Sequence, residues 1–190
     1  MRAHRIKASQ SVLQMLSEHG CPICAFLKNV QTKLVQDGDV TDFSQLCNAH
    51  AWAVAAVRQT ETAARIFLAL LEARPAEGKH ECSICLRLEQ EEIFRLHELI
   101  VALDGRQALD WVKAHGVFCL PHGLRLRTEA PLAVRALIDQ LLDRRASELQ
   151  SALTRLLADA SQGISEHGGV LGRAAEYLVA QRGISLGRSV

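Results

Sequence analysis

The chain of 190 residues has almost no excess charge and few aromatic side chains. Its formal net charge is +1, and phenylalanine, tryptophan and tyrosine together make up 4% of its residues. Proteins that bind nucleic acid present a basic surface, commonly interleaved with aromatic side chains, so this composition disfavours nucleic acid as a partner. The near-neutral charge also provides no field that would attract an anionic membrane surface.

The sequence also lacks a long apolar run. No stretch approaches the roughly 20 apolar residues that a membrane-spanning helix needs, so no membrane association is expected. Residues 1–10 are polar and basic and contain no apolar core of a secretory signal. We therefore expect a cytoplasmic protein in a reducing compartment, where closely spaced cysteines bind metal or take part in redox chemistry.

All six cysteines fall within one pattern that occurs twice. Each copy has a C-x-x-C pair followed by a C-x-x-H element, with 22 intervening residues in the first copy and 33 in the second. Three thiolates and one imidazole form a complete tetrahedral ligand set for zinc, so we predict two zinc ions per chain. The predicted ligands are Cys21, Cys24, Cys47, His50, Cys82, Cys85, Cys119 and His122.

The spacing of these elements fits the start of a helix. Pro22 suits the first helical position, where no N–H donor is needed, and the helix dipole would stabilise nearby thiolates. In C-x-x-H, the offset of three residues places sulfur and imidazole on one side of a helical turn. Sequential pairing would join the two halves of each copy. The alternative is a cross-braced arrangement, in which the two copies exchange ligands.

The apolar periodicity predicts an all-α protein made of two related helical hairpins, each pinned by a Cys3His site, plus C-terminal helices. The predicted units are 1–75 and 79–190, separated by a linker at 74–78, with one compact domain as the alternative. Apolar residues at helical spacing predict helices over 26–35, 51–73, 86–103, 108–114, 131–158 and 171–181.

Several residues near the motifs are secondary candidates. His19 and His80 each lie two residues before a C-x-x-C pair, where they are expected to act as a fourth ligand, to hydrogen-bond a thiolate, or to be exposed. Trp52 and Trp111 are expected to pack around the metal sites. The adjacent residues Glu91 and Glu92 are expected to lie on a solvated helix face.

Three segments carry a resemblance to known proteins. Cys21–Cys24, Leu46–Trp52 and Phe118–His122 resemble the repeated C-P-x-C and G-[LF]-C-x-x-H elements of an uncharacterised group of bacterial helical proteins. Ser83 replaces the proline in the second copy, and Gln45 stands where this pattern has glycine. The resemblance implies an all-helical metal protein and supplies no reaction.

The first functional hypothesis is a structural zinc protein that presents a helical surface, such as 131–158, to a protein partner or to a second copy. The alternative is a thiolate-based enzyme for sulfur transfer or thiol redox chemistry that uses the cysteines of one metal site, with the first copy as the candidate. An iron–sulfur protein is the second alternative, because cysteine thiolates are the usual ligands of such clusters. The sequence names no catalytic residue.

Overall fold

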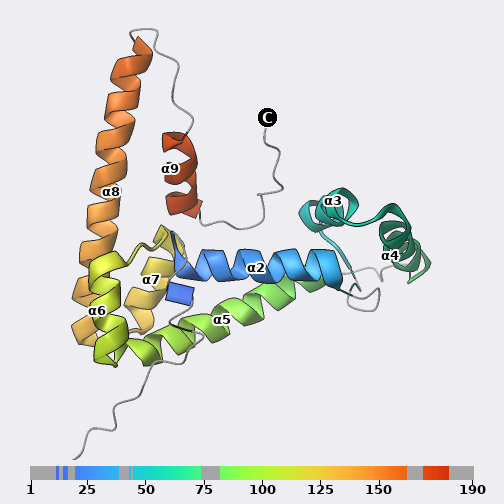
Figure 1. Ribbon diagram of the computed structural model, residues 1–190, viewed down its shortest axis with the longest axis horizontal. Helices are drawn as coiled ribbons and strands as arrows, with labels where there is room; N and C mark the ends of the chain where they lie inside the picture. Colours follow the sequence, from blue (N-terminus) through green and yellow to red (C-terminus); the bar gives the residue numbers. More distant parts are fainter. Residues whose placement is uncertain are drawn as a thin grey trace, which may run out of the picture. The chain divides into compact units, whose positions relative to one another are not determined.

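The computed structural model describes Val12, Met15, Leu16, 20–38, Phe43, 45–73, 82–161 and 169–179. Every regular element in these ranges is an α-helix, which confirms the predicted all-α fold (Figure 1). His19, His80 and the predicted linker 74–78 lie outside the described residues. The helices are α2 (Pro22–Asp37), α3 (Asn48–Val57), α4 (Thr60–Ala73), α5 (Ser83–Leu103), α6 (Arg106–His115), α7 (Leu120–Glu129), α8 (Leu132–Ser161) and α9 (Val170–Val179).

The single helix predicted over 51–73 is two helices, because Arg58 ends α3 in an extended conformation. Its guanidinium donates hydrogen bonds to the backbone oxygens of Val35, Leu34 and Gly38, the last at 2.5 Å. The last carbonyls of a helix have no intrahelical donor, and a cation is favourable at that end. Arg58 therefore caps the C-terminal end of α2. The same residue separates helix α3 from helix α4.

The described residues form two compact units that interleave along the sequence. Residues up to Ala25 and residues from Arg95 onward form the first unit, and Phe26–Phe94 forms the second. The second unit is thus inserted into the sequence of the first. No helix of the described ranges is both long and apolar enough to cross a membrane.

The core of the first unit lies where α7, α8 and α9 pack against one another (Figure 1). The apolar side of α8 is buried there, and Tyr177 Oη donates a hydrogen bond to the Leu142 carbonyl at 3.2 Å. We expected α8 to form an association surface, but its apolar side is packed against other helices of the first unit. The buried residues of α8 are Val134, Ile138, Leu141, Leu142 and Leu149.

Gly123 allows α7 to approach α8 closely. A Cβ atom at this position would lie 2.5 Å from Leu142 Cδ2, which is too close for any real contact. We expect Gly123→Ala to lower the free energy of unfolding by about 1–3 kcal/mol, the usual range for overpacking. Gly172→Ala in α9 is the control, because a Cβ there meets nothing within 4 Å. Urea unfolding checks the pair, and equal effects of the two substitutions would contradict this packing.

The second unit has its own core, which includes one of the predicted metal ligands. Cys82 and the neighbouring Ile84 are buried in a cluster with side chains of α2, α3 and α4. Metal binding and hydrophobic packing therefore involve the same residues in this unit. The other buried members of the cluster are Val35, Phe43, Ala53, Val54, Ala63 and Ile66.

Candidate metal centres

The eight predicted ligands gather into two groups of three cysteines and one histidine. Within each group the ligand atoms all lie within 4.8 Å of one another. Each group lies wholly within one compact unit. Site 1 consists of Cys21, Cys24, Cys119 and His122, and site 2 consists of Cys47, His50, Cys82 and Cys85.

The sequential pairing of ligands is wrong, and the two copies exchange their half-sites. The C-x-x-C of the first copy meets the C-x-x-H of the second, and the C-x-x-H of the first meets the C-x-x-C of the second. Helix geometry explains the difference. The 16 residues of α2 carry the chain about 24 Å along a helix that contains Cys24, and the described residues between Asp37 and Cys47 contain no helix that returns it.

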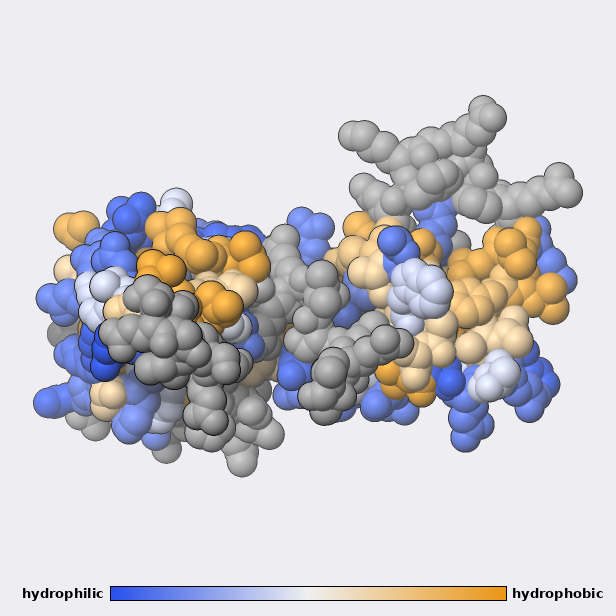
Figure 2. Space-filling view, turned by 90° about the horizontal axis from the view of Figure 1, so that it is seen from above, coloured by the Kyte–Doolittle hydropathy of each residue, from blue (hydrophilic) through white to orange (hydrophobic). Residues whose placement is uncertain are grey.

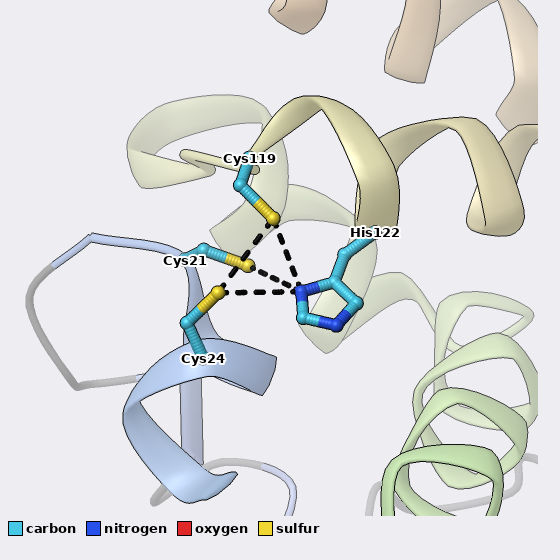
Figure 3. Close-up of side chains that lie close together, drawn as sticks. All are labelled: Cys21, Cys24, Cys119 and His122. Carbon is cyan, nitrogen blue, oxygen red and sulfur yellow. Dashed lines mark hydrogen bonds between the residues drawn. The ribbon is translucent and has the colours of Figure 1, made fainter. Parts of the chain in front are cut away.

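In site 1 the three sulfur atoms surround a single ring nitrogen (Figure 3). The Sγ atoms of Cys21 and Cys24 are each 3.4 Å from His122 Nδ1, and Cys119 Sγ is 3.1 Å from it. An imidazole nitrogen has one lone pair or one hydrogen, so it can make only one good hydrogen bond. Three thiols converging on it therefore point to a common centre and not to a hydrogen-bond network.

Site 2 repeats this arrangement. Cys47 Sγ and Cys82 Sγ are each 3.3 Å from His50 Nδ1, and Cys85 Sγ is 3.4 Å from it. His50 Nε2 is buried and has no hydrogen-bond partner among the described residues. Both histidines thus turn Nδ1 toward the thiols, as expected if Nδ1 is the ligand atom.

The distances fit a tetrahedron of the size that zinc requires. A Zn–S bond of about 2.3 Å and a Zn–N bond of about 2.0 Å imply edges of roughly 3.8 Å between sulfurs and 3.5 Å between sulfur and nitrogen. The observed sulfur–sulfur distances are 3.6 Å for Cys24–Cys119 and 3.9 Å for Cys47–Cys85. The sulfur–nitrogen distances are slightly shorter than the ideal edge. The donor set and its spacing therefore fit one zinc ion at each site.

Hydrogen bonds stabilise one thiolate in each site. Burial acts to raise the pKa of Cys21, but side-chain and backbone hydrogen bonds from Cys119 and Cys24 lower it well below its ordinary value. Burial likewise acts to raise the pKa of Cys82, but backbone hydrogen bonds from Cys47 and Cys85 lower it. Cys21 and Cys82 are the first cysteines of their C-x-x-C pairs, so the pKa is lowered at the same motif position in both sites.

One thiol in each site is not stabilised as an anion by the protein alone. Burial and the charge of Cys82 raise the pKa of Cys85 to about 12. Hydrogen bonds with Cys21 and Cys24, together with burial, raise the pKa of Cys119 far above its ordinary value. Each site therefore needs a bound cation before all its thiols ionise, and metal binding must release protons.

Helix starts place the ligands. Cys47 and Cys119 are the N-cap residues of α3 and α7, so each C-x-x-H histidine falls in the first turn of its helix. Gly20 directly precedes the first C-x-x-C and has φ +85°, a left-handed conformation that glycine adopts without strain. The α-helical hydrogen bond Ala25 N–H to Cys21 O is matched by Leu86 N–H to Cys82 O.

Ser83, which replaces the proline of the first copy, has a role that sequence reasoning missed. Its backbone N–H and its hydroxyl both donate to the Gln45 carbonyl, at 3.0 and 3.1 Å. Proline has no N–H and could not make the first of these bonds. The two departures from the repeated pattern, at positions 83 and 45, thus contact each other and tie the two halves of site 2 together.

Two expectations about neighbouring residues are wrong. Trp52 does not pack around a site, because 69% of it is exposed on α3. Glu92 does not lie on a solvated face, because only 3% of it is exposed. Glu91 pairs with Arg87 at 3.1 Å. A charged residue buried in a helix with otherwise ordinary periodicity has no local sequence signal, so only the tertiary structure shows it.

The first copy, which we expected to be the more reactive one, contributes two buried thiols. Cys21 and Cys24 are both buried, whereas the exposed cysteine of the chain is Cys85 in site 2. The accessible thiol of the two groups therefore belongs to site 2.

The second tryptophan near the motifs, Trp111, lies beside His115, with ring centroids 5.2 Å apart.

No protein-family model, curated protein or solved structure matches this chain. The resemblance to the group of bacterial helical proteins stays a prediction. The functional argument therefore rests on the geometry of the two sites and on the surfaces around them.

Proposed function

We propose that this chain is a zinc-binding helical protein in which two Cys3His zinc ions hold the helices in place for interaction with a protein partner or a second copy. The observation that carries the proposal is the convergence of three thiols on one histidine Nδ1, at 3.1–3.4 Å, in both sites. Two independent groups with the same geometry use every cysteine of the chain.

The spacing of the ligands favours zinc over an iron–sulfur cluster. Ligand atoms that all lie within 4.8 Å of one another can surround one ion. A cluster contains at least two irons and bridging sulfides, so its protein ligands must be spread more widely. Thiolate and imidazole together are also the typical donors of structural zinc sites.

When bound, each zinc would supply a cross-link between distant parts of the chain. Site 1 joins the start of α2 to the start of α7, and site 2 joins the start of α3 to the start of α5. Zinc binding in small modules contributes on the order of 10 kcal/mol to folding. The protein itself supplies the converging donors, most of them buried, at the helix starts that the ion would join.

The surface of α3 and α4 supports the interaction part of the proposal. Trp52, Leu68 and Leu71 are exposed there, and Leu71 is 74% exposed. Figure 2 shows hydrophobic residues gathered over this part of the second unit. Contiguous apolar surface on a protein typically marks an interaction site. We expect Leu71→Glu to weaken association in sedimentation experiments, whereas Leu132→Glu, at a still more exposed position on α8, should not.

Elemental analysis of the purified protein, together with its visible spectrum, tests the metal part of the proposal. We expect two zinc ions per chain and no colour, because zinc has a filled d shell. Iron in the analysis, together with a brown colour, would contradict the zinc assignment and indicate an iron–sulfur cluster. A protein that stays folded with no bound metal would overturn the proposal altogether.

A further inference from the structure

The two sites differ in how far solvent reaches their thiols. All four ligands of site 1 are buried, and none is more than 9% exposed. In site 2, Cys85 is exposed and Cys47 is partly exposed, whereas Cys82 and His50 are buried. The same donor set is therefore sealed in one unit and open on one edge in the other.

The open edge consists of two thiols from different parts of the chain. Cys47 comes from the start of α3 and Cys85 from the first turn of α5, and their Sγ atoms are 3.9 Å apart. A disulfide needs about 2.05 Å, so the sulfurs must approach by roughly 2 Å. Cysteines that react with oxidants have thiolate character, are accessible, and have a second cysteine close by to resolve the first product.

We propose that site 2 is a thiol-oxidation site for hydrogen peroxide, at which Cys85 and Cys47 form a disulfide and the metal is released while site 1 keeps its ion. This inference rests on the proposed zinc-binding function, because the ion that would be released is the one which that function places at site 2. The inference adds to the proposed function a response to peroxide that begins at site 2.

The reaction balances with peroxide as the only co-reactant. The Cys85 thiolate attacks one oxygen of hydrogen peroxide, the O–O bond breaks, and Cys85 becomes a sulfenic acid as hydroxide leaves. The Cys47 thiolate then attacks the Cys85 sulfur and displaces a second hydroxide. The two sulfurs lose two electrons in total, and peroxide gains them. Only Cys82 and His50 then remain as donors, and two protein ligands do not hold zinc in a closed structural site.

All four ligands of site 2 lie in the second unit. Site 2 lies in Phe26–Phe94, which has its own core, and Cys47 caps the start of α3. Loss of site 2 would therefore loosen α3, which carries the exposed Trp52. The first unit contains no ligand of site 2.

The test uses the full chain loaded with zinc, whose metal content is counted before any oxidant is added. A chain that holds no zinc at that stage contradicts the proposed function itself. Stoichiometric hydrogen peroxide is then added, released zinc is followed with a chromophoric chelator, and disulfides are mapped by mass spectrometry. We expect one zinc ion per chain to be released, with a Cys47–Cys85 disulfide. Cys85 should also be alkylated faster than Cys24, by on the order of tenfold or more.

Two matched variants complete the test. Cys85→His keeps four ligands at site 2 as a Cys2His2 set but removes the reactive thiol, so it should retain zinc in peroxide. His97→Ala, at an exposed position of α5 that belongs to neither metal group, is the control and should leave peroxide-induced release unchanged. Loss of both ions together, a disulfide within site 1, or no release from the zinc-loaded wild-type chain would overturn the inference. The wild-type measurements decide the matter even if either variant fails to fold.

Discussion

Replacing His122 with alanine will remove one of two metal ions and unfold the first unit. His122 is 1% exposed, and its Nδ1 lies within 3.4 Å of all three thiols of site 1. A structural zinc ion contributes on the order of 10 kcal/mol, which is comparable to the whole stability of a typical domain of about 5–15 kcal/mol. Zinc content and thermal unfolding followed by circular dichroism measure both effects on the same sample.

His97→Ala is the matched control for this prediction. His97 is exposed on α5 and lies in neither metal group. Surface substitutions of this kind usually change stability by less than about 0.5 kcal/mol, and the variant should keep both zinc ions. A His122→Ala protein that bound two zinc ions and unfolded no more easily than His97→Ala would show that site 1 does not hold the fold together.

Zinc affinity will fall steeply as the pH is lowered. The pKa of Cys119 in site 1 is raised without metal, and that of Cys85 in site 2 is raised to about 12. Both thiols are therefore protonated near neutral pH, and zinc must displace a proton from each. Bound zinc holds these groups as thiolates below their ordinary pKa, so its contribution to stability is present at high pH and is lost in acid.

The expected size follows from proton counting. One displaced proton weakens binding about tenfold for each unit by which the pH is lowered. The zinc affinity of each site should therefore fall at least about tenfold per pH unit. Competition with a chromophoric zinc chelator of known pH dependence measures this slope. A slope near zero over the neutral range would mean that the thiols are already ionised without metal, contrary to the surroundings of Cys119 and Cys85.

Sequence reasoning went furthest where chemistry restricts the choice of residue. The C-x-x-C and C-x-x-H elements use every cysteine, so their spacing alone predicted the metal-binding chemistry and the number of metal groups. Helical periodicity predicted the all-α fold and the approximate positions of α2, α5, α6, α8 and α9. Both kinds of inference depend on local spacing, which a linear sequence shows directly.

Features that depend on distant contacts could not be predicted in this way. The break between α3 and α4 depends on Arg58 reaching the end of α2, more than 20 residues earlier. The pairing of half-sites depends on where α2 and α5 carry the chain, and the spacing of the motifs was compatible with either arrangement. The burial of Glu92 likewise follows from packing that its own helix does not signal.

The exchange of half-sites is tested most directly by counting zinc in two double variants. In Cys24→Ser/Cys119→Ser both substitutions fall in site 1, so the protein should keep one zinc ion, at site 2. In Cys24→Ser/Cys47→Ser each site loses a ligand, so tightly bound zinc should be absent. The opposite result, with no zinc in the first variant and one ion in the second, would contradict the exchange and restore the sequential pairing.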